Sequence, residues 1–168
     1  SLGASFTLAV PYTVFLVTIP RTLAANQYAL DGITLNTIAI QSQTTNLFAF
    51  GDAGFQRTGV LAVGAFFYYT LIANGASSAT YFNGGTEITG TEGAATGGIR
   101  LGSAANDTVF GNFDIAEVIV YNTALSAANR ASVESYISQK YNRTDARFAF
   151  LRSAELLHRR DSGVLVAF

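Results

Sequence analysis

Residues 109–141 read VFGNFDIAEVIVYNTALSAANRASVESYISQKY, and this stretch decides the fold. Its first half predicts a strand over residues 113–121, because β-branched and apolar residues dominate it. Side chains alternate along a strand, so one predicted face holds Ile115, Glu117 and Ile119, and the other holds Ala116, Val118 and Val120. Only Glu117 interrupts this apolar character. We therefore expect the strand to lie inside a sheet that is covered on both faces.

A turn and a helix follow this strand. Asn122 and Thr123 are typical turn residues. Ser126 is a natural helix N-cap, because its hydroxyl can accept a hydrogen bond from a free amide of the first helical turn. Apolar residues then recur at helical spacing. The sequence therefore predicts a helix over residues 126–139.

The rest of the chain predicts many short strands separated by turn residues. The predicted strands cover residues 6–10, 12–19, 27–33, 37–41, 46–50, 66–73, 79–82, 86–89 and 99–101. Residues 51–64 and 90–98 predict loops. Asn-Gly pairs at 74–75 and 83–84 favour hairpin turns. Frequent short strands of this kind are typical of an antiparallel sandwich.

Three motifs in the same order resemble a known family. FDIAEVIVYNTALSAANRASVESYISQKY, at 113–141, resembles the C-terminal signature of laminin G-like domains in the concanavalin A-like lectin/glucanase superfamily. YFNGGTEI, at 81–88, resembles a hairpin of that family, and GGIRLGS, at 97–103, resembles the strand between the two. The family contains lectins, hydrolases, adhesion modules and virion proteins, so the resemblance implies a fold and leaves the function open.

The fold that the resemblance implies is all-β. We expect an antiparallel jelly-roll β-sandwich of the concanavalin A-like type, with one short helix near the C-terminal part. The sandwich is predicted over residues 1–142, and residues 143–168 form a C-terminal helix and strand extension that departs from the family pattern.

Composition narrows the class of protein. A chain of 168 residues suits one domain. Charged residues make up only 12%, about half the usual share, which suits an extracellular or virion-surface β-protein. The net charge of −1 argues against nucleic-acid binding. The chain has no Cys, so disulfides, thiolate metal sites and Cys nucleophiles are excluded. The apolar segment 8–19 is too short to cross a bilayer as a helix, so we expect no membrane insertion.

Catalysis is not expected. Laminarinase-like relatives carry a Glu-x-Asp-x-x-Glu strand motif, and Asp114 and Glu117 match its last two positions. Asn112 stands where the first Glu is needed, and an amide cannot form the glycosyl-enzyme intermediate. His158 is the only His, which leaves no other base for a Ser-His-acid triad. We expect no enzyme and no cofactor.

Calcium remains an open alternative, because some laminin G-like and pentraxin-like relatives bind it at loop ends. Its ligands are oxygens, and the predicted loops hold Asp31, Asp52, Asn106 and Asp107. The alternative explanation is that these residues only form turns.

A glycan site would use exposed aromatic rings with polar neighbours. The candidate platforms are Phe55, Tyr81, Phe110 and Phe113, and the candidate polar partners are Arg57, Asn106 and Asp107. The absence of Trp weakens this hypothesis. Most aromatic residues in so Phe-rich a sandwich are expected in the core.

The C-terminal extension predicts a surface for assembly. Residues 1–142 carry a net charge of −3 and residues 143–168 carry +2. The candidate assembly residues are Arg147, Arg152, Arg159, Arg160, Val164, Leu165, Val166 and Phe168. An uncharged β-prone end invites pairing with another chain. The extension either reaches a neighbouring subunit or folds back over its own sandwich.

Two functions follow as expectations. The first is a non-enzymatic structural or interaction protein of an extracellular or virion assembly, such as a decoration, tail, fibre or surface-layer protein, with neighbouring subunits or other assembly proteins as partners. The alternative is a lectin-like carbohydrate-binding module that attaches to surface glycans.

Overall fold

The computed structural model of the chain describes residues 2–34, 38–43, 46–51 and 54–141. It divides into two compact units, Ser1–Glu134 and Ser135–Phe168. Helix α1 (Ala127–Tyr141) begins in the first unit and ends in the second. The predicted all-β antiparallel sandwich with one short helix is confirmed.

The first unit contains two antiparallel sheets, and the sequence order of their strands is interleaved. The six-stranded sheet has the order β1 (Leu2–Leu8), β10 (Thr96–Leu101), β3 (Ala25–Gly32), β4 (Ile40–Gln43), β5 (Asn46–Gly51), β6 (Gly54–Val60). The five-stranded sheet has the order β11 (Phe113–Tyr121), β2 (Tyr12–Pro20), β7 (Phe67–Ala73), β8 (Gly75–Phe82), β9 (Ile88–Glu92).

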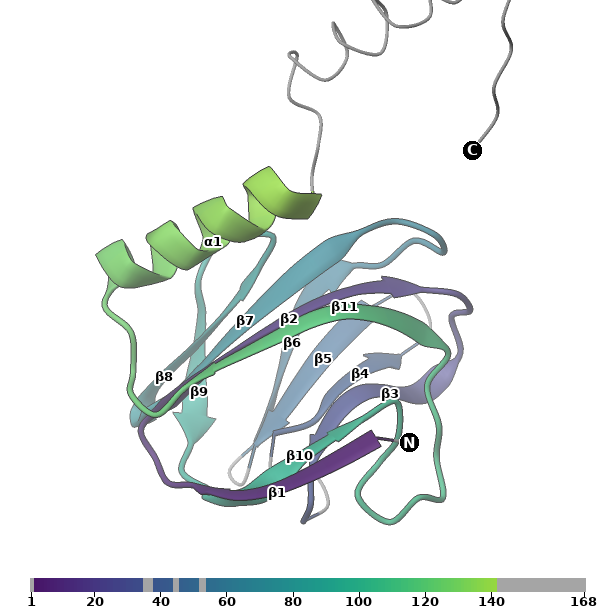
Figure 1. Ribbon diagram of the computed structural model, residues 1–168, viewed down its shortest axis with the longest axis horizontal. Coiled ribbons are helices and arrows are strands. Elements are labelled where there is room, and N and C mark those ends of the chain that lie inside the picture. Colours follow the sequence, from purple (N-terminus) through teal and green to yellow (C-terminus); the bar gives the residue numbers. More distant parts are fainter. Residues whose placement is uncertain (1, 35–37, 44–45, 52–53, 142–168) are drawn as a thin grey trace, which may run out of the picture. The chain divides into compact units, whose positions relative to one another are not determined.

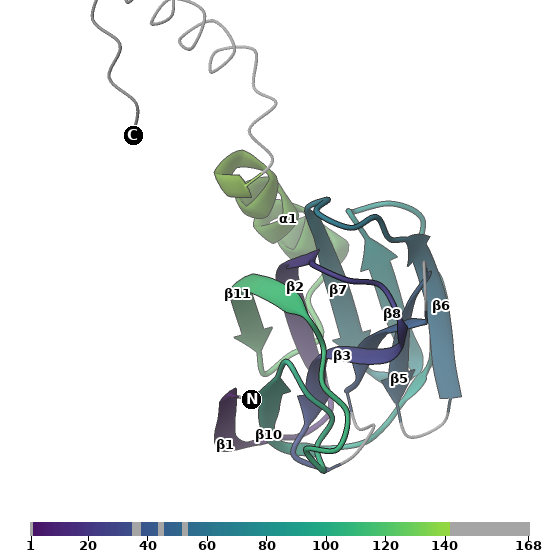
Figure 2. The same cartoon turned by 90° about the vertical axis from the view of Figure 1, so that its right-hand side faces the viewer.

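The two sheets stack face to face, and the main core lies between them (Figures 1 and 2). Strands β2 and β7 form its centre, because both are buried along nearly their whole length. Large side chains that are fully buried in this core include Tyr12, Leu16, Leu30, Ile40 and Tyr69. Apolar burial on this scale supplies the main driving force for folding.

The first two turns of helix α1 are fixed to the outer face of the five-stranded sheet. Asn129 donates its amide to Ser126 Oγ at 3.3 Å, so the predicted N-cap is confirmed. Thr70 Oγ1, on β7, donates to Glu134 Oε1 at 3.0 Å. Arg130 Nη1 donates to both oxygens of Glu134, at 2.9 and 2.7 Å. These contacts attach the start of the helix to the sheet.

Strand β11 is an edge strand, so its predicted position inside a sheet is wrong. It pairs with β2 on one side, and no other strand of the described part of the chain pairs with it. Its residues are half-buried or exposed. Val118 and Val120 lie at the edge of the sheet and pack against the core. Apolar side chains of this kind led to the prediction of a covered strand.

A β-bulge changes the faces of β11. Ala116 is an extra residue between the pairs that Ile115 and Glu117 make with β2. Ile115 and Val118 both pack against the core, so the prediction that Ile115 and Glu117 share a face is wrong. A bulge inserts one residue and shifts the alternation by one position. Asp114 and Glu117 therefore fall on the side away from the core.

Several strand boundaries differ from the predictions. Strand β6 falls in the predicted loop 51–64, and β9 and β10 extend into the predicted loop 90–98. These segments are rich in Gly and Thr, and pairing with a neighbouring strand overrides their weak local preference. Strand β8 starts at Gly75, inside the predicted turn 74–75 and four residues before the predicted strand 79–82.

Candidate functional site

A small hairpin joins β10 to β11 and carries most of the predicted polar site residues. We call it the 102–111 hairpin. Its stem is closed by the Ala104 amide, which donates to the Val109 carbonyl at 2.8 Å, and by the Gly111 amide, which donates to the Gly102 carbonyl at 2.9 Å. Ser103 and Phe110 form an antiparallel bridge between these two bonds. The tip consists of residues 105–108.

The two faces of the 102–111 hairpin have different roles. Ala104 and Val109 pack with Tyr28 of β3 and with Ala39, which precedes β4, in a separate small core. Directly opposed residues of an antiparallel pair place their side chains on the same face. Phe110 and Ser103 therefore share the other face, where Ser103 is fully buried and Phe110 is 57% exposed. The buried face thus holds the hairpin in place while the other presents an aromatic ring.

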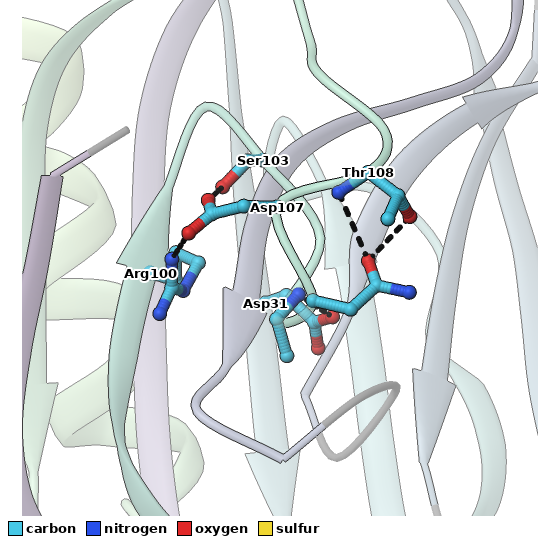
Figure 3. A network of polar contacts seen from close by, with 7 residues as sticks. Asp31, Arg100, Ser103, Asp107 and Thr108 are labelled. Atoms are coloured by element: carbon cyan, nitrogen blue, oxygen red, sulfur yellow. Dashed lines mark hydrogen bonds and ion pairs between the residues drawn. The ribbon is translucent and has the colours of Figure 1, made fainter.

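A chain of polar contacts fixes the tip on the Phe110 side. Ser103 Oγ donates to Asp107 Oδ1 at 2.9 Å, and Arg100 Nη1 forms an ion pair with Asp107 Oδ2. Figure 3 shows Ser103, Asp107 and Arg100 connected in this order. Asp107 has a φ of 53°, a left-handed conformation that Asp tolerates better than most residues. The carboxylate is thereby held in one orientation, and 46% of the Asp107 side chain stays exposed.

The remaining tip residues form a second set of bonds. Asn106 Oδ1 accepts hydrogen bonds from the Thr108 amide at 3.2 Å and from the Thr108 hydroxyl at 2.7 Å. Both side chains are exposed. These bonds occupy the oxygen of the Asn106 amide group, and its two N–H donors lie on the nitrogen, Nδ2. The Asn106 side chain is thus oriented and can donate to a ligand.

Strand β3 anchors the hairpin from beneath. Asp31 is fully buried, and its Oδ2 accepts the Ala105 amide at 3.0 Å while its Oδ1 accepts the Gly32 amide at 2.7 Å. Figure 3 shows Asp31 below the hairpin tip. Asp31 is also the strand partner of Arg100. A side chain at Gly111 would overlap the Tyr28 carbonyl, so only glycine allows the stem to approach β3 this closely.

Burial and a nearby negative charge act on the Tyr28 hydroxyl below the hairpin. Burial raises the pKa of Tyr28, and the Asp31 carboxylate raises it further. Tyr28 is therefore neutral at physiological pH and acts as an apolar support for the hairpin.

The structure places three of the seven predicted glycan-site residues on one hairpin: Asn106, Asp107 and Phe110. The sequence reasoning missed Arg100, Ser103 and Thr108. Arg100 lies in a strand seven residues before Asp107, and only the fold of the hairpin brings the two together. The signal available for Ser103 and Thr108 was their position beside Asn106 and Asp107 in a polar segment.

Tyr81 was predicted as an exposed platform, and this prediction is wrong. Tyr81 is buried on β8 in the other sheet. The Arg130 guanidinium lies over its ring at 3.7 Å from the centroid, and the Tyr81 hydroxyl donates to Glu87. The ring is therefore covered by a cation of the same chain and cannot stack on a sugar.

Phe55 and Arg57 lie on β6, far from the hairpin in the sheet. Four strand spacings separate β6 from β10 in the six-stranded sheet, which corresponds to about 19 Å. The orientation of these two side chains lies outside the described residues. They therefore do not join Phe110 in one site. Phe113 is half-buried against the core.

The carboxylates of the glucanase-like motif have structural partners. Asp114 forms an ion pair with Arg21, and the Arg21 amide donates to the Asn112 carbonyl at 2.8 Å. The hydrogen bond from Arg21 lowers the pKa of the Asp114 carboxyl. A proton donor for glycoside hydrolysis needs a raised pKa. The lowered pKa of Asp114 instead favours its anionic form.

The described residues were compared with the ligand groups that a metal ion needs. No group of three or more His, Cys, Asp and Glu side chains gathers there in a way that could hold a metal ion. Asp31 and Asp107 lie near one another in the hairpin region, yet both carboxylates accept hydrogen bonds from the protein. Asp52 lies outside the described residues, so the calcium alternative stays a prediction.

The predicted assembly residues also lie outside the described residues. They are Arg147, Arg152, Arg159, Arg160, Val164, Leu165, Val166 and Phe168. The predicted boundary between residues 142 and 143 stays a prediction for the same reason. Within the described part of the chain, no helix is long and apolar enough to span a membrane.

Comparisons with known proteins identify the fold. No protein-family model matches the chain, and no curated protein matches its sequence. Among solved structures, a mutant of Trypanosoma rangeli sialidase with trans-sialidase activity is similar with a TM-score of 0.62 and 12% sequence identity. The match covers 83% of this chain and 28% of the sialidase chain. The chain thus spans under a third of that protein.

Two smaller proteins are similar over most of their own length. A heptameric SAP-like pentraxin from Limulus polyphemus has a TM-score of 0.57 and 14% identity, with 79% of this chain and 72% of the pentraxin covered. Domain 4 of AbnA, a GH43 extracellular arabinanase from Geobacillus stearothermophilus, was solved with arabinotriose. It has a TM-score of 0.55 and 18% identity, with 75% and 67% covered. The chain therefore shares the β-sandwich fold of these domains.

Proposed function

We propose that the chain is a non-catalytic carbohydrate-binding module and that a glycan binds the exposed face of the 102–111 hairpin. The observation that carries the proposal is the exposed Phe110 ring on a hairpin whose opposite face is packed in a core. Such a ring can stack on the apolar face of a sugar without first being ordered. Asp107 and Asn106, at the tip of the same hairpin, have oriented polar side chains.

The comparisons support this function at the level of fold alone. One similar structure is a domain that was solved with arabinotriose. The laminin G-like assignment rests on the motif in residues 113–141 and belongs to the same proposal. An extracellular or virion-surface location is part of it as well, because surface glycans are met there.

The absence of catalysis is also proposed. Asn112 cannot act as a nucleophile, and the pKa of Asp114 is lowered by Arg21. We expect no product when the protein is incubated with β-glucans, arabinan or sialosides and the mixture is analysed by chromatography. Product that forms with the natural chain and disappears in the Glu117→Gln variant would contradict the proposal.

A glycan array with the full chain tests binding. We expect hits with the natural sequence and loss of those hits in the Phe110→Ala variant. Phe6→Ala is the matched control, because Phe6 is another partly exposed Phe, on β1, with 37% of its side chain accessible. An array without any hits, in the presence and absence of calcium, would overturn the carbohydrate-binding proposal.

A structural role in an assembly is the second candidate, and one observation favours it. Val60, at the end of β6, is 73% exposed, and the following loop exposes Val63 by 59% together with Ala62 and Ala65. No charged residue occurs between Arg57 and Glu87. Exposed apolar side chains that gather on one surface are typical of protein contacts. Light scattering of the natural chain and of a Val60→Ser, Val63→Ser variant tests it, and equal masses for both would contradict it.

A further inference from the structure

The chain contains two Asn-Gly pairs, and each lies in a turn between strands of the five-stranded sheet. Asn74-Gly75 joins β7 to β8, and Asn83-Gly84 joins β8 to β9. Both asparagines are exposed. A glycine that follows asparagine offers the least steric resistance to attack of its nitrogen on the asparagine side chain, because glycine has no Cβ. Both pairs therefore have the chemistry for deamidation, and their surroundings decide which one reacts.

Hydrogen bonds hold the Asn83 side chain against strand β7. Its Oδ1 accepts the Tyr68 amide at 2.9 Å, and the Asn83 amide donates to the Tyr68 carbonyl at 2.9 Å. A rotation of the Asn83 side chain toward the Gly84 nitrogen breaks the first of these bonds. A Cβ at Gly84 would lie 2.7 Å from the Tyr68 hydroxyl oxygen and 3.3 Å from Glu134 Oε2. Side chains of the same protein therefore also pack on this glycine.

The surroundings of Asn74 leave its side chain free. The backbone is fixed, because the Asn74 amide donates to Ser78 Oγ at 2.8 Å and the Asn74 carbonyl accepts the Ser77 amide at 3.1 Å. Within the described part of the chain, the Asn74 side chain itself makes no hydrogen bond or ion pair. A Cβ at Gly75 would meet no atom within 4 Å. The Asn74 side chain can therefore rotate toward the Gly75 nitrogen, and the space beside that glycine is open.

We propose that Asn74 is a site of spontaneous deamidation in the folded protein, and that Asn83 is protected from the same reaction. The Gly75 nitrogen loses its proton to the solvent and attacks Cγ of Asn74. The bond between Cγ and the side-chain nitrogen breaks, and ammonia leaves. Water then opens the succinimide ring at one of its two carbonyls, which produces aspartate or isoaspartate at position 74. One water is consumed and one ammonia is released, so no oxidant or reductant is needed.

The modification changes both charge and backbone. No charged residue occurs between Arg57 and Glu87, so the new carboxylate is the first charge in this segment. The net charge of −1 becomes one unit more negative. In isoaspartate the main chain also passes through the former side-chain CH₂, which lengthens the turn that the Ser77 amide and the Ser78 hydroxyl close. We therefore expect an acidic species on ion exchange and a lower melting temperature for its isoaspartate form.

Incubation of the full chain in mildly alkaline buffer tests the site. Chymotrypsin cleaves after Tyr81 and Phe82 and so separates the two Asn-Gly pairs, and mass spectrometry of the peptides measures deamidation at each. In the folded chain, Asn83 should react at least about tenfold more slowly than Asn74, which corresponds to about 1.4 kcal/mol of activation free energy. In guanidinium chloride the ratio should fall below about threefold, because unfolding removes the hydrogen bond that holds Asn83. The Asn74→Ser variant should lack the first acidic species.

Three results would overturn the proposal. If Asn83 reacts as fast as Asn74 in the folded chain, the bond to Tyr68 does not protect it. If Asn74 reacts only after unfolding, the backbone bonds to Ser77 and Ser78 already prevent ring closure. If the unfolded chain keeps the same ratio of rates, the neighbouring residues in sequence cause the difference and the fold does not. None of these results depends on whether the protein binds a glycan.

Discussion

The surroundings of the Tyr81 hydroxyl change its pKa. Burial, and then the hydrogen bond to Glu87, raise the pKa of Tyr81 from 10.0 to about 12, against the opposing charge of Arg130. A raised pKa in the folded state stabilises the fold below the unfolded value of about 10. This contribution is lost as the pH rises through about 12.

We therefore expect a late titration of Tyr81 in alkaline solution. The ultraviolet absorbance of the natural chain minus that of a Tyr81→Phe variant should give a single transition with a midpoint near pH 12. The Phe variant should lose stability less steeply between pH 10 and 12. A midpoint near 10 would mean that the Tyr81 hydroxyl is exposed and does not donate to Glu87.

At the scale of elements, the attachment of the start of helix α1 to the sheet depends on a buried ion pair. Glu134 and Arg130 have side-chain exposures of 9% and 16%, and Glu134 also accepts the Thr70 hydroxyl. Glu134→Ala would leave a guanidinium buried without its carboxylate. Removal of one partner of a buried pair costs roughly 3–5 kcal/mol. We expect a loss of this size in chemical denaturation.

The matched control for this prediction is the exposed pair. Arg21 and Asp114 have side-chain exposures of 52% and 51%, and exposed ion pairs contribute little because water and salt screen them. Asp114→Asn should therefore leave the denaturation midpoint almost unchanged. Equal losses for Glu134→Ala and Asp114→Asn would show that Glu134 does not attach the helix to the sheet.

Local sequence patterns were sufficient to predict some elements of the fold and insufficient to predict others. The strand over 113–121 and the Ser126 cap could be predicted, because alternation and capping depend on nearby residues. The edge position of β11 and the bulge at Ala116 could not, because both depend on pairing with β2, about a hundred residues away in sequence. Strand β6 was missed because its strand character comes from β5.

The same distinction applies to the candidate site. Asn106, Asp107 and Phe110 lie close together in the sequence, so a shared loop could be predicted. Arg100 and Asp31 enter the site through the register of β10 against β3. No pattern within either strand reveals that register. The burial of Tyr81 likewise depends on a helix that begins more than forty residues later.

At the scale of the whole molecule, the fold of the sandwich should not depend on its last residues. Strands β1, β2, β3, β4, β7, β8, β10 and β11 all contribute side chains to one core within the first compact unit. We expect a chain that lacks residues 143–168 to keep its β-type circular dichroism spectrum and a cooperative melting transition. Size-exclusion chromatography should show reduced assembly if these residues pair with a neighbour.

Two results would contradict this expectation. A truncated chain that aggregates or loses its β-spectrum would show that residues 143–168 complete the core of their own sandwich. A truncated chain with unchanged spectrum and unchanged assembly would exclude the predicted role of the extension in subunit contacts.

The hairpin between β10 and β11 separates the residues that secure it from those that meet the solvent. Its stem is fixed through backbone bonds and through the packing of Ala104 and Val109, and Asp31 holds the tip by the main-chain amide of Ala105. None of these attachments requires a particular side chain at positions 106 and 108. New recognition could therefore evolve by substitution at the tip without loss of the fold. The same property makes the sandwich a display scaffold, in which a library randomised at these positions could be selected for new binders.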